Sequence, residues 1–204
     1  MLRKIIQIIS WEPSGRLLVW AVRLLVVTLG LSVSYHVHTV GRKHAPLSLV
    51  REVRSLSIPA GSEGEVYQWV YDHSSKISRR QCKVIVDEMN KYDKPLLLIA
   101  ISRLESGGFD PTALSGKGAY GLMQVRYSAH KEMLAKAGVI DPRDLYDIEP
   151  NIKAGHVIIT QELKQANGDI TKALEGYLGG QDGYYVKKVA VDLAELYCRV
   201  YKTK

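Results

Sequence analysis

From Ser62 to the C-terminus, apolar residues recur with a helical period, and turn-forming residues separate the periodic segments. Glycines mark the breaks between segments: Gly138, Gly168, Gly179 and Gly180. No run of alternating β-branched residues predicts a substantial sheet, although the glycine-rich residues 113–122 would suit a short hairpin. The pattern therefore predicts one compact, all-α or α-rich domain over residues 62–204.

Local signals place the first helices of this domain. Ser62, with Glu65 three residues later, has the spacing of a capping box, and Ser78 is expected to cap a second helix. Pro95 opens a third helix, and its residues 96–101 are so uniformly apolar that this helix is expected at the centre of the domain. Four further helices are expected over residues 127–137, 150–166, 170–177 and 185–201.

The N-terminal part has a different character. Residues 17–34 (LLVWAVRLLVVTLGLSVS) are apolar apart from Arg23, and their number is close to the roughly 20 residues that cross a bilayer as a helix. Three basic residues precede this segment: Arg3, Lys4 and Arg16. The positive-inside tendency then leaves the N-terminus in the cytoplasm and puts the rest of the chain, from residue 35 on, outside.

Three interpretations of residues 17–34 remain open. We favour an uncleaved membrane anchor over a signal peptide cleaved after Ser34, and over a buried helix of a cytoplasmic protein. The expected organisation is an anchor or signal segment (residues 1–35), a linker (36–61) and the helical domain (62–204). That domain would lie in the periplasm of the cell envelope, held at the inner membrane or exported.

The chain carries a formal net charge of +7, with a pI near 9.3. Such an excess attracts polyanions, including anionic lipid headgroups and cell-wall polymers. No nucleic-acid recognition motif accompanies it, so a nucleic-acid partner is not expected.

The two cysteines, Cys82 and Cys198, form no CxxC pair and have no zinc-type spacing with histidine, so no metal site is expected. Both lie in stretches of helical pattern. Two buried free thiols are favoured over a disulfide between the two helices.

One glutamate stands out. Glu105 ends the most apolar helix, and a glycine-rich stretch follows it at once. Apolar neighbours and the negative end of the helix dipole would both raise its pKa, as a general acid requires. The alternative is an ordinary surface glutamate at a helix end.

The surrounding residues 99–125 (IAISRLESGGFDPTALSGKGAYGLMQV) resemble the signature of family 1 lytic transglycosylases, roughly E-S-G-F-x-P-x-A-x-S-x-x-G-A-x-G-L-M-Q. This is the soluble lytic transglycosylase (SLT) domain of the lysozyme-like superfamily, and the chain has one extra glycine before Phe109. Residues 151–155, 173–180 and 185–189 resemble the family's N-I-x-A-G, A-L-x-A-Y-N-x-G and Y-V-x-K-V segments. The resemblance covers about residues 77–189.

This resemblance implies an α-rich, lysozyme-like (α+β) fold with a glycan cleft, a monomer without cofactor or metal, and Glu105 as the sole catalytic acid. Residues implied to line or adjoin the cleft are Ser115, Met123, Gln124, Tyr177 and Tyr185. Tyr177 would hydrogen-bond near the carboxylate, although core packing is the alternative for both tyrosines. Gly118 and Gly121 would let the backbone approach the glycan closely.

The chain departs from the family pattern at the A-Y-N triplet. Leu178 replaces the asparagine, whose amide can hydrogen-bond a sugar, and Gly176 replaces the preceding alanine. The expected activity is cleavage of the β-1,4 bond between N-acetylmuramic acid and N-acetylglucosamine, leaving 1,6-anhydromuramic ends. Alternatives are a lysozyme-like hydrolase and a non-catalytic peptidoglycan-binding module, which the loss of the asparagine would favour.

Overall fold

The computed structural model describes residues 56–74 and 76–201. The chain divides into two compact units, Met1–Pro46 and Leu47–Lys204, and all described residues belong to the second. The expected anchor or signal segment therefore lies outside the described residues. Within residues 56–74 and 76–201, no helix has the length and apolar character needed to cross a membrane.

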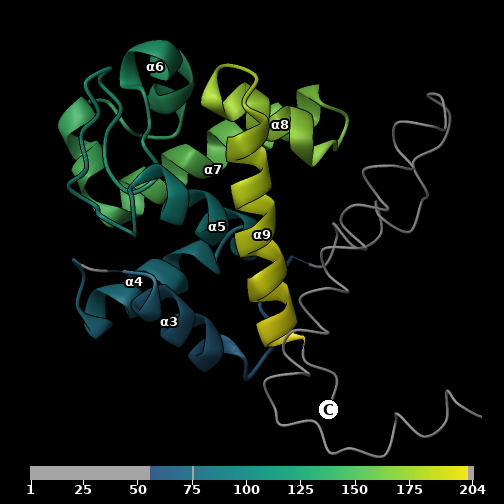
Figure 1. The fold of residues 1–204 in the computed structure, drawn as a ribbon. Helices are drawn as coiled ribbons and strands as arrows, with labels where there is room; N and C mark the ends of the chain where they lie inside the picture. The colour runs from purple at the N-terminus through teal and green to yellow at the C-terminus, as the bar shows by residue number, and fades with distance from the viewer. Residues whose placement is uncertain (1–55, 75, 202–204) are drawn as a thin grey trace, which may run out of the picture. The chain divides into compact units, whose positions relative to one another are not determined.

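The described part of the chain is built from seven α-helices and one 3-10 helix (Figure 1). Their bounds are α3 Glu63–Asp72, α4 Arg79–Met89, α5 Pro95–Glu105, α6 Tyr127–Lys136, η4 Pro142–Tyr146, α7 Ile148–Gln165, α8 Ile170–Leu178 and α9 Gly183–Val200. The predicted α-rich domain is confirmed. In place of the hairpin expected over residues 113–122, the described chain has only two isolated antiparallel bridges, Leu114 with Tyr120 and Tyr120 with Val125.

The predicted helix caps had mixed outcomes. The capping box at Ser78 is confirmed, because the Ser78 side chain accepts from the Gln81 backbone N–H and the Gln81 side chain accepts from the Ser78 N–H. The one predicted at Ser62 is wrong, since its side chain makes no capping bond. Its hydroxyl instead donates to the carbonyl of Val200 at 3.4 Å, so a contact with the end of α9 replaces the local one.

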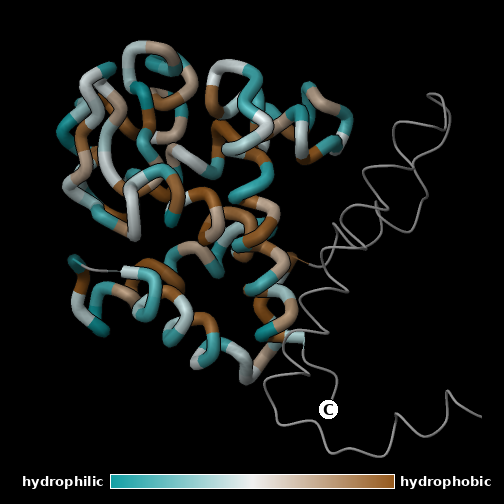
Figure 2. The backbone as a smooth tube through the Cα atoms, viewed as in Figure 1, coloured by the Kyte–Doolittle hydropathy of each residue, from teal (hydrophilic) through white to brown (hydrophobic). Residues whose placement is uncertain are grey.

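The core is arranged around α5. Its residues from Pro95 to Ser102 are all buried, and the helix contacts α4, α7 and α9. Figure 1 shows α9 lying alongside α5, and in Figure 2 the hydrophobic stretches gather where α5 runs through the domain. The predicted central position of this helix is confirmed, and its burial fixes where its last residue, Glu105, lies.

A partly buried ion pair joins α5 to α9. One guanidinium nitrogen of Arg103 lies 2.5 Å from both carboxylate oxygens of Asp192, whose side chain is only 6% exposed. Because Arg103 is two residues before Glu105, this pair holds α9 against the end of α5 at which the candidate acid lies.

Both cysteines are free, but only Cys82 is buried. The prediction that Cys198 is also buried is wrong. Cys198 belongs to α9, and its side chain is exposed on the outer face of that helix.

The Arg103→Met substitution would leave the Asp192 carboxylate buried without its partner. We expect it to lower the free energy of unfolding by about 3 kcal/mol, since removing one member of a buried pair leaves an uncompensated charge. Urea unfolding measures the loss. The matched control is Lys83→Met, which breaks the exposed Lys83–Asp87 pair of α4 and should leave the midpoint nearly unchanged. Equal effects of the two substitutions would contradict the role given to Arg103.

Candidate active site

The site begins with Glu105, the last residue of α5, whose side chain is partly buried. The Tyr185 hydroxyl, from the first turn of α9, donates to Glu105 Oε1 at 2.6 Å. Burial raises the pKa of Glu105 because the ionised form loses hydration, and the Tyr185 hydrogen bond opposes this by stabilising the anion. Among the described residues no other charged group contributes to the shift. Glu105 is thus a desolvated carboxylate with one hydrogen-bond donor.

A second tyrosine lies beside this pair. The Tyr177 hydroxyl of α8 donates to the backbone carbonyl of Met123 at 2.8 Å. Its pKa is raised well above the ordinary 10.0, first by burial and then by the negative charge of Glu105. The pKa of Tyr185 is also raised, by burial, by Glu105 and by Tyr177. Three helices, α5, α8 and α9, therefore bring one carboxyl and two protonated hydroxyls together.

The hydroxyl of Ser115 organises the loop between α5 and α6. Its oxygen accepts the backbone N–H of Ala119 at 2.9 Å and that of Lys117 at 3.3 Å. The Ser115 N–H in turn donates to the Ala119 carbonyl at 2.9 Å. Ser115 therefore shapes the turn that ends just before the Gly-Leu-Met-Gln segment.

Gln124 and Met123 hold the end of that segment in place. Gln124 Nε2 donates to the carbonyls of Ala113 and Gly121, at 3.1 and 2.9 Å. The Met123 side chain is completely buried, and it fills the space where a Cβ on Gly155 would otherwise lie. The Met123 backbone carbonyl thus accepts the Tyr177 hydrogen bond, while the Met123 side chain packs against Gly155 of α7.

Asn151, in the first turn of α7, was not identified from the sequence as a site residue. It is buried, its Oδ1 accepts the Met123 N–H at 2.7 Å, and its Nδ2 donates to the carbonyls of Leu145 and Tyr120, at 2.7 and 2.9 Å. The Asn151 side-chain amide therefore holds the backbone N–H of Met123, the residue whose carbonyl accepts the Tyr177 hydrogen bond. The signal available was its place at the start of the N-I-x-A-G segment.

The two loop glycines differ in their surroundings. Gly118 has φ +72° and nothing within 4 Å of where a Cβ would lie. Gly121 has a similar φ of +71°, but a Cβ there would overlap the Leu145 carbonyl and the Asn151 amide. At Gly121 the missing side chain serves close packing of the loop on η4 and α7.

The positions that depart from the family pattern lie on α8. A Cβ on Gly176 would overlap the carboxylate of Glu162, a residue of α7, so glycine here makes room for that side chain. Leu178 is 39% exposed and ends the helix one residue after Tyr177. Where the family pattern has asparagine, this chain therefore has an exposed apolar side chain next to Tyr177 in the sequence.

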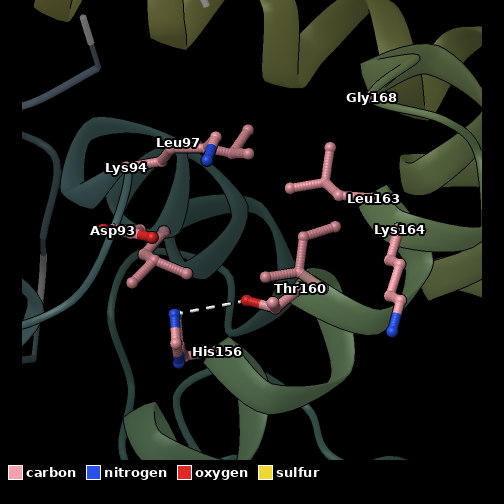
Figure 3. A pocket seen from close by; sticks show the side chains of 10 residues that line it. Asp93, Lys94, Leu97, His156, Thr160, Leu163, Lys164 and Gly168 are labelled. Atoms are coloured by element: carbon pink, nitrogen blue, oxygen red, sulfur yellow. Dashed lines mark hydrogen bonds between the residues drawn. The ribbon is translucent and has the colours of Figure 1, made fainter. Parts of the chain in front are cut away.

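A separate cavity of about 250 Å³ lies at the other end of α5 (Figure 3). Asp93 and Lys94 approach it from the start of α5, and His156 and Thr160, which hydrogen-bond to each other at 3.2 Å, approach it from α7. Neither Glu105 nor the two tyrosines beside it, Tyr177 and Tyr185, are among the residues that line this cavity. Within the described ranges, no group of three or more His, Cys, Asp or Glu side chains is placed to hold a metal ion.

Substitution of the two glycines separates backbone strain from packing. Gly118→Ala should lower the free energy of unfolding by about 1 kcal/mol, the strain of a Cβ in the left-handed region. Gly121→Ala should lower it by about 3 kcal/mol or more, because a backbone carbonyl and the Asn151 amide must also move. Urea unfolding of both variants measures the difference. Equal losses would mean that Asn151 and Leu145 do not constrain the loop as described.

Comparison with known proteins supports the resemblance. The family model described as "Transglycosylase SLT domain" matches residues 84–188, about half of the chain, and this range contains all the site residues described above. Members of the family are generally lytic transglycosylases, and the domain implies binding of peptidoglycan. No solved structure matched the chain. The family predicted from the sequence is confirmed: the chain belongs to the transglycosylase SLT domain family.

Proposed function

We propose that this protein is an active lytic transglycosylase. It cleaves the β-1,4 bond between N-acetylmuramic acid and N-acetylglucosamine and leaves 1,6-anhydromuramic ends. The observation that carries the proposal is Glu105: a partly buried carboxyl whose pKa burial raises, held by Tyr185 at the end of the central helix. A raised pKa favours the protonated form of a carboxylic acid, which is the form that can protonate a leaving oxygen.

The electrostatics of the site favour chemistry with a single carboxylate. Ordinary glycosidases place a second carboxyl about 5–5.5 Å or about 6.5–9.5 Å from the acid. In the described part of the chain, two buried carboxylates are engaged in ion pairs: Asp110 pairs with Lys76 at 2.6 Å, and Asp192 pairs with Arg103. No carboxylate contributes to the pKa shift of Glu105. In the proposed reaction the substrate supplies the second group.

The proposed reaction uses groups of the muramic acid itself. Glu105 first protonates the glycosidic oxygen, and the N-acetyl group stabilises the developing positive charge at C1. Glu105, now ionised, accepts the proton of the 6-hydroxyl as that oxygen attacks C1 and closes the 1,6-anhydro ring. The Tyr185 hydroxyl stabilises the carboxylate between the two steps, because it donates to Oε1.

We also propose that residues 17–34 anchor or export the chain, with residues 62–204 outside the cytoplasm where peptidoglycan lies. The support is the length and apolar character of that segment and the basic residues before it.

Mass spectrometry of fragments released from purified sacculi tests the proposed reaction. The wild-type protein should release fragments with anhydromuramic ends, and Glu105→Gln should reduce the release by about 100- to 10,000-fold, the usual contribution of a general acid. Glu132→Gln, which changes an exposed glutamate of α6, is the matched control and should retain activity.

Two results would reject the proposal. Reducing ends would make the protein a hydrolase with a water nucleophile. Absence of release by the wild-type protein, with binding to sacculi retained, would make it a wall-binding module and direct attention to Leu178.

The pH dependence of turnover tests the Tyr185 contact. The hydrogen bond from Tyr185 lowers the pKa of Glu105, so Tyr185→Phe should raise that pKa further. Since the first step needs protonated Glu105, activity falls as pH rises through this pKa, and the alkaline limb of the profile should move to higher pH. The control is Tyr184→Phe, at an exposed neighbour. An alkaline limb that stays in place or moves to lower pH contradicts the role of the hydrogen bond.

A further inference from the structure

The cavity at the start of α5, about 250 Å³ in volume, has an apolar floor. Leu97 and Leu98 of α5 and Ile159 of α7 line it and are almost completely buried, and Leu163 of α7 adds a fourth aliphatic side chain. Glu105 lies at the opposite end of α5, roughly 15 Å away along the helix. A ligand in this cavity therefore lies away from the bond that Glu105 would cleave.

Charged side chains surround this floor. Lys94 directly precedes α5 and Lys164 belongs to the last turn of α7, and Figure 3 shows them on opposite sides of the cavity. Neither lysine forms an ion pair with a described residue. Asp93 is the one carboxylate among the described residues that line the cavity. Two ammonium groups and one carboxylate give the rim a net positive charge, which favours an anionic ligand.

His156 forms a neutral polar wall between these charges. Its ring packs on the ring of Tyr92 with the centroids 4.6 Å apart, and its Nε2 hydrogen-bonds to Thr160 Oγ1 at 3.2 Å. Burial lowers the pKa of His156, which leaves the imidazole neutral at pH 7. The charges of Asp93 and Lys94 also act on this pKa, in opposite directions, so both groups lie near the ring.

The backbone at the start of α5 is already engaged. Pro95 has no N–H, the Leu96 N–H donates to the Leu56 carbonyl at 3.2 Å, and the Leu97 N–H donates to the Lys94 carbonyl at 3.0 Å. The first N–H groups of the helix are therefore not directed at a ligand. An anion in this cavity would be held by the lysine side chains.

The cavity thus offers two cations, one carboxylate and an aliphatic floor, in a volume below the roughly 300 Å³ at which sites for drug-sized ligands begin. Peptidoglycan stem peptides combine the complementary groups on a small scale. They end in alanine residues with a free carboxylate, and they carry the side-chain amine of a diamino acid.

We infer that this cavity binds the C-terminal end of a peptidoglycan stem peptide, an inference that rests on the proposed function. The terminal carboxylate lies between Lys94 and Lys164, the alanine methyl groups pack on the aliphatic floor, and the amine of the diamino acid pairs with Asp93. Each group of the ligand then meets a group of opposite charge or of like polarity. The cavity recognises the stem peptide and takes no part in cleavage.

An NMR titration of the full-length protein, labelled with ¹³C at its methyl groups and held in a neutral detergent, tests this assignment. Acetyl-L-Lys-D-Ala-D-Ala should shift the methyl signals of Leu97, Leu98 and Ile159, and it should leave those of Ile85, a buried residue outside the cavity, in place. The same peptide with a C-terminal amide should bind about tenfold more weakly, because the charge-assisted contacts of the carboxylate are lost. No shift of the cavity signals, or equal affinity for the acid and the amide, would overturn the inference.

The variant Lys164→Met tests the lysine contact. It removes the charge and keeps much of the aliphatic length, and it should raise the Kd for the acid peptide about tenfold. The matched control is Lys153→Met, which removes an exposed lysine of the same helix outside the cavity and should leave the Kd unchanged. Equal Kd values for the two variants contradict the assignment.

Two further outcomes identify the ligand and separate this inference from the proposed function. Tighter binding of N-acetylmuramic acid, which carries a lactyl carboxylate, would assign the cavity to the glycan and overturn the peptide assignment. The peptide has no sugar bond, so its binding is measured independently of cleavage. A protein that binds the peptide as described but releases no anhydromuramic ends would support this inference and reject the proposed reaction.

Discussion

Burial of α5 from Pro95 to Ser102 is the constraint on which the rest of the domain depends. The helix is buried from Pro95 to Ser102, and Glu105, three residues later, is still partly buried, which raises the pKa of its carboxyl. Burial of a carboxylate is unfavourable unless it is neutralised or hydrogen-bonded. A raised pKa and the Tyr185 hydroxyl meet that requirement, and the same two features suit Glu105 to acid catalysis.

The other parts of the site are fixed by contacts that join elements far apart in the sequence. Arg103 and Asp192 tie α5 to α9 and so place Tyr185 opposite the carboxyl. Asn151 binds the Met123 peptide to α7, and the Met123 carbonyl then receives Tyr177. The geometry of the candidate site therefore depends on paired polar groups with low exposure. Such groups rigidify a site when each has its partner.

How far the sequence predicts this structure depends on the range of each interaction. The Ser78 cap and the central helix were predictable, because local spacing and apolar runs determine them. The Ser62 cap was predicted wrongly, because a contact with the distant end of α9 replaces it. Burial of Cys198 was predicted wrongly because a helical pattern does not say which face of the helix meets the core. For the same reason the family motif marks Asn151 and Tyr185 without giving their hydrogen-bond partners. Those partners lie 28 and 80 residues away, respectively.

The central claim is that Glu105 is protonated more readily than an ordinary glutamate. The direct measurement is the titration of its carboxyl carbon by NMR in protein labelled with ¹³C-glutamate, with the Glu105→Gln variant used to assign the signal. We predict a pKa above the ordinary value of 4.5. A pKa at or below 4.5 would show that the Tyr185 hydrogen bond outweighs burial, and Glu105 would then be ionised at neutral pH and unable to act first as an acid.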